Sequence, residues 1–146
     1  MSAIRTTLTA AVLALAPLAA LAEGQVHKLA IHVDEDDRRL LNMALNNAQN
    51  VYNHYTEQGD EVIIEVVAYG PGLSMFVDGE SPVADRVAAM SLELENITFS
   101  ACGNTIANRE KRQGTPVTLL SEAQVVPSGV VRLMELQGEG YAYIRP

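Results

Sequence analysis

The alternation of short apolar segments with longer helix-like segments is the feature that most limits how this chain can fold. Strand-like runs rich in β-branched and apolar residues occur five times, at residues 26–33, 62–68, 96–101, 123–126 and 141–144. Helix-like segments lie between them. This order predicts an α/β protein with an open, mostly parallel five-stranded sheet and helices on both faces. No internal repeat or linker is present, so we expect residues 23–146 to form one domain.

Capping residues predict where several of these helices begin and end. Asp34 to Asp37 are acidic and suit the first turn of a helix that Gly59 ends near Gln58. Ser81 and Pro82 fit the cap and first position of a helix that continues to about Leu94. A further helix runs from the end of the third strand to about Gln113, and Ser128 is expected to cap the last helix.

Cys102 is the only cysteine, and the pattern places it where the third strand turns into a helix. A thiol at a helix N-terminus is close to the positive end of the helix dipole, which favours the thiolate. A single cysteine cannot form an intramolecular disulfide, and it cannot support C-x-x-C oxidoreductase chemistry. Cys102 is therefore a candidate nucleophile or carrier, and the alternative is a small buried cysteine without chemistry.

Polar and glycine residues follow each of the first four strands. Because the carboxyl ends of parallel strands meet at one edge of a sheet, these residues are expected to gather there, where open α/β sheets bind ligands. Glycines in these loops would let a substrate or partner backbone approach closely. The candidate binding residues are His32, Asp34, Gly70, Gly72, Gly103, Asn104, Thr105 and Ser128.

Residues 1–22 have the composition of a secretory signal peptide. They contain one positive charge at Arg5, a long apolar run, and Ala20-Leu21-Ala22 before Glu23. We expect cleavage after Ala22 and a periplasmic or secreted protein with no membrane association after cleavage. The formal net charge of −8 at pH 7 argues against nucleic acid and anionic membrane surfaces as partners.

No pattern indicates a metal or a cofactor. The three histidines, His27, His32 and His54, lack metal-ligand spacing, although His32 could orient or protonate a group near Cys102. Gly70-Pro71-Gly72 is neither a dinucleotide fingerprint nor a Walker A loop. We therefore expect no metal site and no cofactor.

Several segments resemble those of the DsrE/DsrF-like sulfur-relay family, in its branch of small single-domain proteins. They are IHVDEDD, ALNNAQN, VVAYGPGL, FSACGNT and the closing VVPSGVVRLMELQGEGYAYIRP. The resemblance implies a flavodoxin-like open sheet and a homo-oligomer, either a trimer or a hexamer. It also implies that Cys102 carries sulfane sulfur as a persulfide and passes it to a partner protein.

Two functional hypotheses follow. In the first, the protein is a sulfur carrier that works with a sulfur donor or acceptor protein, and Asn104, Thr105 and Arg109 assist Cys102. In the second, it is a non-catalytic module that binds a small ligand or a partner with the same loops, and Cys102 is only packed.

Overall fold

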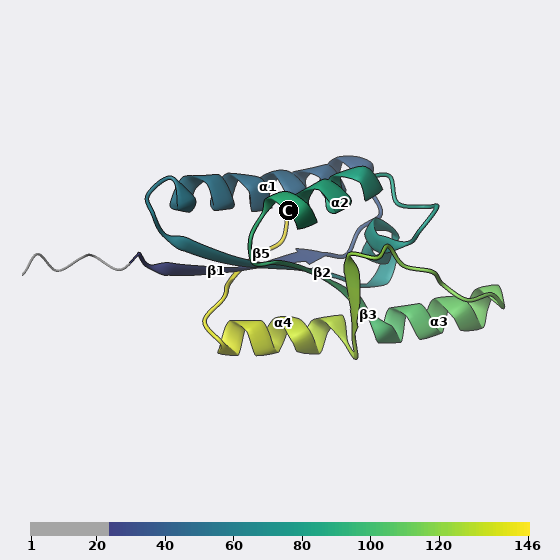
Figure 1. Cartoon of the computed structure of the whole chain (residues 1–146). Helices are drawn as coiled ribbons and strands as arrows, with labels where there is room; N and C mark the ends of the chain where they lie inside the picture. Colours follow the sequence, from purple (N-terminus) through teal and green to yellow (C-terminus); the bar gives the residue numbers. More distant parts are fainter. Residues whose placement is uncertain (1–23) are drawn as a thin grey trace, which may run out of the picture.

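The computed structural model describes residues 24–146, which form a sheet with helices on both faces (Figure 1). The strands are β1 (Val26–Val33), β2 (Glu61–Ala68), β3 (Ile97–Cys102), β4 (Ala123–Val126) and β5 (Ala142–Ile144). The helices are α1 (Arg38–Thr56), the 3-10 helix η1 (Gly70–Phe76), α2 (Ala84–Glu93), α3 (Gly103–Gln113) and α4 (Gly129–Gly138). The predicted signal peptide, residues 1–22, lies outside the described residues.

The five strands form one all-parallel sheet in the order β4-β3-β2-β1-β5, which confirms the predicted open α/β, flavodoxin-like class. Helices α1 and α2 cover one face, while α3 and α4 lie on the other side (Figure 1). The connection that leaves β2 therefore goes to the opposite side from the helix that leaves β3. A divergence of this kind between neighbouring strands opens a crevice at the carboxyl edge of the sheet.

The main hydrophobic core lies between the sheet and helices α1 and α2. It is built from apolar residues of β1, β2 and β3, together with Leu41 and Leu45 of α1 and Phe76 of η1. A smaller cluster on the other face consists of Ala30, Val67, Leu133 and Leu136, so α4 packs on the sheet through few side chains. Helix α3 buries none of its residues. The face that carries α3 and α4 is consequently the less completely covered one.

The acidic stretch before α1 acts as a cap and not as a first turn, which corrects the expectation from the sequence. The helix begins at Arg38, and the carboxylate of Asp37 accepts hydrogen bonds from the backbone N–H groups of Arg39 and Leu40 at 2.8 and 3.0 Å. The helix ends at Thr56, and Gly59 follows with a φ of 84°, a conformation that favours glycine.

The predicted start of α2 at Pro82 is wrong, because the helix begins at Ala84. The hydroxyl of Ser81 donates to the carbonyl of Met75 at 2.6 Å and accepts from the N–H of Val83 at 3.3 Å. These bonds hold residues 81–83 in a turn against η1, and α2 starts only after it.

Strand β5 lies at one edge of the sheet beside β1 and has three residues. A short edge strand offers few unpaired backbone groups to other chains. None of the helices in the described part of the chain is long and apolar enough to cross a membrane.

Candidate functional site

The carboxyl ends of β1, β2 and β3 bring most of the predicted site residues to one edge of the sheet. Cys102 is the last residue of β3, and α3 begins at the next residue without an intervening turn. Cys102 is only 4% exposed, so the thiol is buried at the junction of β3 and α3. The adjacency of strand and helix has a simple cause: Gly103 has no side chain, and a Cβ there would lie 3.1 Å from the carbonyl oxygen of Val126.

The electrostatic surroundings of Cys102 favour the thiolate. Burial raises the pKa of the Cys102 thiol, but the hydroxyl of Thr105 and three backbone N–H groups lower it by more. These N–H groups belong to Gly129, Thr105 and Asn104. The pKa of Cys102 therefore lies below its ordinary value, as expected at a helix N-terminus. We call these groups, with the sulfur, the Cys102 site.

Gly70 and Thr105 are brought together beside the sulfur. The N–H of Gly70, at the start of η1, donates a hydrogen bond of 3.0 Å to the hydroxyl oxygen of Thr105. Because that oxygen is already an acceptor, its own proton remains available for the sulfur of Cys102. Gly70 adopts a φ of 55°, which a residue with a side chain rarely does.

Gly129 belongs to this site, although sequence reasoning did not single it out. A Cβ on Gly129 would lie 2.9 Å from the ring of Tyr69 and 3.2 Å from the Cβ of Cys102. Only a glycine lets the start of α4 approach the thiol so closely. The Pro127-Ser128-Gly129 turn before a helix was the signal that could have indicated it.

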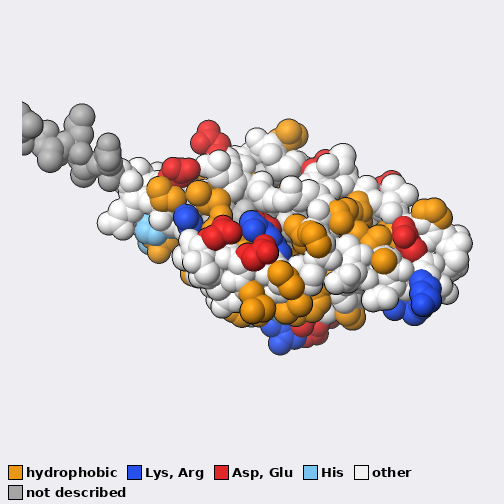
Figure 2. Space-filling model, turned by 90° about the horizontal axis from the view of Figure 1, so that it is seen from below, with side chains coloured by type: hydrophobic (Ala, Val, Ile, Leu, Met, Phe, Trp, Pro, Cys, Tyr) orange, Lys and Arg blue, Asp and Glu red, His pale blue; other side chains and the backbone are white. Residues whose placement is uncertain are grey.

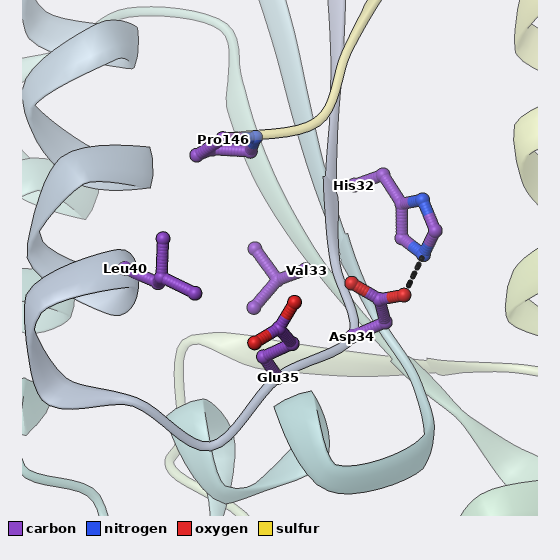
Figure 3. A pocket seen from close by; sticks show the side chains of 6 residues that line it. All are labelled: His32, Val33, Asp34, Glu35, Leu40 and Pro146. Carbon is purple, nitrogen blue, oxygen red and sulfur yellow. Dashed lines mark ion pairs between the residues drawn. The ribbon is translucent and has the colours of Figure 1, made fainter.

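His32 lies next to this site and stacks on Tyr69, with ring centroids 4.6 Å apart. Its Nδ1 is 2.6 Å from the hydroxyl of Tyr143. Its Nε2 has no hydrogen-bond partner among residues 24–146 and lies 3.7 Å from the Asp34 carboxylate (Figure 3). Burial lowers the pKa of His32, and nearby Asp34 opposes this while Arg145 adds to it. Asp34 is in turn bound by Arg145 at 2.9 Å, which ties the end of the chain to the β1–α1 loop.

The remaining predicted residues serve other purposes. A Cβ on Gly72 would lie 2.4 Å from the carbonyl oxygen of Val33, so this glycine admits the protein's own backbone and not that of a ligand. Ser128 stands at the cap position of α4, but its side chain makes no capping hydrogen bond. Asn104 contributes its backbone N–H to the Cys102 site, and its side chain is exposed.

Two clefts flank the site. One, of about 520 Å³, lies between η1 and α3 and includes Gly70 and Thr105 in its lining. The other, of about 320 Å³, includes Ser128 and Arg132. No three His, Cys, Asp or Glu side chains cluster as a metal site anywhere in residues 24–146.

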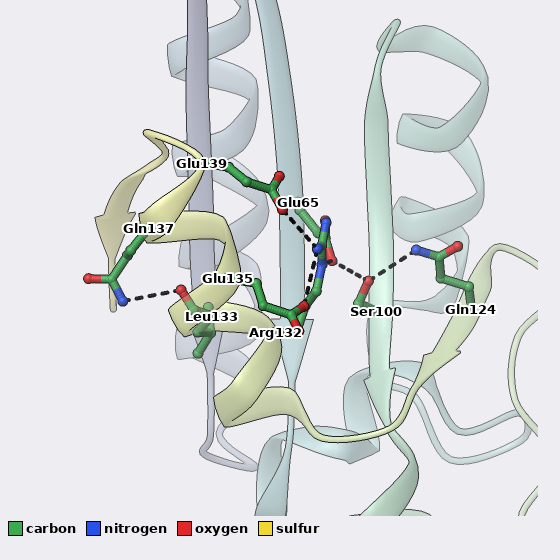
Figure 4. Close-up of polar contacts among 8 residues, drawn as sticks. All are labelled: Glu65, Ser100, Gln124, Arg132, Leu133, Glu135, Gln137 and Glu139. Atoms are coloured by element: carbon green, nitrogen blue, oxygen red, sulfur yellow. Dashed lines mark hydrogen bonds and ion pairs between the residues drawn. The ribbon is translucent and has the colours of Figure 1, made fainter.

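A buried ion pair lies beneath the second cleft, and sequence reasoning missed it (Figure 4). Glu65, in the central strand β2, is 4% exposed and accepts two hydrogen bonds from the guanidinium of Arg132 on α4, at 2.9 and 2.7 Å. The Ser100 hydroxyl donates to the same carboxylate at 2.7 Å. A single glutamate inside the apolar run VIIEVVA was the available signal, because a buried carboxylate requires a partner.

A solved structure described as a protein of unknown function, MTH1491 from Methanobacterium thermoautotrophicum, is similar to this chain. The two share 31% sequence identity and superpose with a TM-score of 0.70, over 82% of this chain and 99% of the archaeal one. The chain belongs to the MTH1491 family. Membership in the MTH1491 family supports the fold but brings no activity with it, since the description of that protein names none. No protein-family model matches the sequence, and no curated protein matches it either.

Proposed function

We propose that this protein carries sulfane sulfur as a persulfide on Cys102 and passes it to a partner protein. The observation that supports the proposal most directly is the set of hydrogen-bond donors around the Cys102 sulfur, the Thr105 hydroxyl and three backbone N–H groups, which lower the pKa of the thiol despite its burial. The thiolate is the nucleophilic form of cysteine, and the same donors also stabilise the anionic terminal sulfur of a persulfide.

The sulfur transfer needs no external oxidant or reductant. The Cys102 thiolate attacks the outer sulfur of a persulfide R–S–SH and forms a new S–S bond. The bond between the two donor sulfurs breaks, and the electron pair leaves with R–S⁻. The products are the Cys102 persulfide and the thiolate R–S⁻. In a second step of the same kind, an acceptor thiolate attacks the outer sulfur of the Cys102 persulfide, and the Cys102 thiolate leaves.

The resemblance of FSACGNT and the closing segment to the DsrE/DsrF-like sulfur-relay family supports the same assignment. The proposed export signal would place this chemistry in the periplasm or outside the cell. There the lone thiol of Cys102 meets oxidising conditions, so a dedicated donor or acceptor protein is part of the proposal.

Incubation with inorganic polysulfide tests the assignment. The intact mass of the folded protein should increase by whole sulfur atoms, and dithiothreitol should reverse the increase. Cys102→Ser should abolish the adduct and leave the circular dichroism spectrum unchanged. A wild-type protein that takes up no sulfur contradicts the proposal.

A matched pair of variants at Thr105 tests the physical cause. Thr105→Val keeps the size of the side chain but removes the hydroxyl, so the pH midpoint of iodoacetamide alkylation of Cys102 should rise. Thr105→Ser keeps the hydroxyl and should retain the wild-type midpoint. Equal midpoints in the two variants would show that the hydroxyl does not stabilise the thiolate.

The second candidate function is a non-catalytic binding or assembly module, and the burial of Cys102 favours it. In that case the thiol is a packing group, as free cysteines commonly are. The folded protein should then resist iodoacetamide at pH 6, and Cys102→Ser should lower the stability substantially.

The proposal includes assembly into a trimer or hexamer. Apolar side chains lie on the face that carries α3 and α4 (Figure 2), and the exposed ones from β4 and α4 are Val125, Val130, Val131 and Met134. Contiguous exposed apolar surface is typical of protein interfaces. Light scattering should report the oligomer at tens of micromolar, and Met134→Glu should dissociate it. A monodisperse wild-type monomer contradicts this part.

A further inference from the structure

The cleft of about 520 Å³ between η1 and α3 has the size of a small-molecule site, and one wall is a single polar face of α3. Thr105, Asn108, Arg109 and Arg112 line it, at the i, i+3, i+4 and i+7 spacing that places residues on the same side of a helix. In most helices this spacing holds the apolar residues that pack on the core. Here it presents hydrogen-bond donors to an open cleft.

Two of the charged groups that line the cleft pair with each other, and two others do not form ion pairs among the described residues. Arg109 forms an ion pair with Glu80, which neutralises both. Arg112 makes no ion pair or side-chain hydrogen bond within residues 24–146, so its positive charge is available to a ligand. The Asp36 carboxylate, beside η1, accepts only one hydrogen bond from a side chain of the described residues, at 2.6 Å from the Ser74 hydroxyl. It can accept further bonds from a cation. The cleft therefore complements a ligand that carries both a carboxylate and an ammonium group.

The cleft also borders the Cys102 site through Thr105 and Gly70. Thr105 lines it and, through its hydroxyl, acts on the sulfur of Cys102. Along the helix axis, Thr105 and Arg112 are about 10 Å apart, at 1.5 Å per residue. An extended tripeptide spans about the same length. A tripeptide with its carboxylate on Arg112 is thus long enough to reach the residue that covers the thiol.

We propose that this cleft binds a small zwitterionic peptide thiol and that such a thiol, as its persulfide, is the sulfur donor of Cys102. The donor role rests on the proposed function, whereas the binding of the peptide does not. In the bound state the ligand carboxylate pairs with Arg112, the ammonium group pairs with Asp36, and the sulfur lies at Thr105.

Titration calorimetry with S-methylglutathione tests the binding step without any sulfur transfer, because its methylated sulfur is unreactive. The full domain, with and without Cys102→Ser, should bind it equally. Arg112→Gln should weaken binding about tenfold, the effect of losing one charge-assisted hydrogen bond. Lys111→Gln, a neighbouring exposed position on α3 that does not line this cleft, is the matched control and should bind as wild type does.

A second ligand tests the opposite charge. N-Acetyl-S-methylglutathione lacks the ammonium group, so it should bind more weakly to the wild type and should lose nothing further in Asp36→Asn. Absence of S-methylglutathione binding at millimolar concentration would overturn the proposal, as would equal losses in Arg112→Gln and Lys111→Gln.

Sulfur uptake separates this proposal from the proposed function. If S-methylglutathione binds through Arg112 but neither glutathione persulfide nor polysulfide adds sulfur to Cys102, the carrier function fails and the donor assignment fails with it. If polysulfide adds sulfur but S-methylglutathione does not bind, the carrier function holds and the cleft assignment fails. If Cys102 takes up sulfur faster from glutathione persulfide than from cysteamine persulfide, and Arg112→Gln removes this difference in rate, both the carrier function and the cleft assignment are supported.

Discussion

Replacement of Arg132 by methionine should destabilise the protein through the charge that it leaves behind. Arg132 supplies two hydrogen bonds to Glu65, at 2.9 and 2.7 Å, and Glu65 is buried in the central strand β2. In Arg132→Met the carboxylate keeps only the Ser100 hydroxyl, at 2.7 Å, as a side-chain donor among the described residues. A buried carboxylate without its counter-charge is costly because neither water nor a cation solvates it.

The expected cost is about 3 kcal/mol. Loss of one partner from a buried ion pair typically costs about 3–5 kcal/mol. The lower end applies because the Arg132 side chain is 26% exposed, so water can reach part of the space that it leaves. A domain of this size has a total stability on the order of 5–15 kcal/mol, and the melting temperature should fall by roughly 10 °C.

Urea unfolding followed by circular dichroism measures this change, with Lys111→Met as an exposed control that should stay within about 0.5 kcal/mol of wild type. The double variant Glu65→Leu/Arg132→Met removes both charges and should recover most of the loss, apart from about 1 kcal/mol for the Ser100 hydroxyl that loses its acceptor. If the double variant is no more stable than Arg132→Met, charge burial is not the cause.

Two further predictions concern the carboxyl edge of the sheet. Gly72→Ala should cost about 1–3 kcal/mol of stability in urea unfolding, because its Cβ would lie 2.4 Å from the Val33 carbonyl oxygen. Gly138→Ala is the control and should be neutral or stabilising, because no atom of the described residues lies within 4 Å of its Cβ. Because the pKa of His32 is lowered in the folded protein, the unfolded state binds more protons below the ordinary value of 6.5. The free energy of unfolding should therefore fall as the pH drops from 6.5 toward the folded pKa, and this part of the decrease should be absent in His32→Asn; identical pH profiles for the two proteins would refute the assignment.

Most of the fold could be predicted because the local strand and helix signals of this sequence agree with the tertiary environment in which each segment packs. The run VIIEVVA reads as a buried strand, and it becomes the centre of the sheet. The exceptions arise where a side chain is used in a tertiary contact. Ser81 has the character of a helix cap, but its hydroxyl binds the Met75 carbonyl, and no local pattern indicates this competition.

The candidate site could be predicted only in part, for a related reason. Cys102 ends β3, and Gly70 and Thr105 come shortly after the ends of β2 and β3, so the sheet brings them together as the sequence indicates. Gly129 reaches the thiol because α4 returns to the same edge after β4, and the distance of that return depends on packing. Glu65 and Arg132 are likewise 67 residues apart in the sequence. Their pairing depends on how α4 packs against β2, which no local sequence pattern indicates.

The same contacts that bury Cys102 also make it acidic, which links the chemistry of the site to its packing. A thiol buried among apolar groups alone would have a raised pKa and little thiolate at neutral pH. Here three of the surrounding groups are backbone N–H donors at the starts of helices α3 and α4. Both helices can approach the thiol only because Gly103 and Gly129 lack side chains. Exposing the sulfur by moving either helix would give a reagent access and would remove donors that stabilise the anion. The proposed sulfur exchange at Cys102 is therefore best served by a ligand that arrives through the side lined by Thr105, where the backbone donors can stay in place.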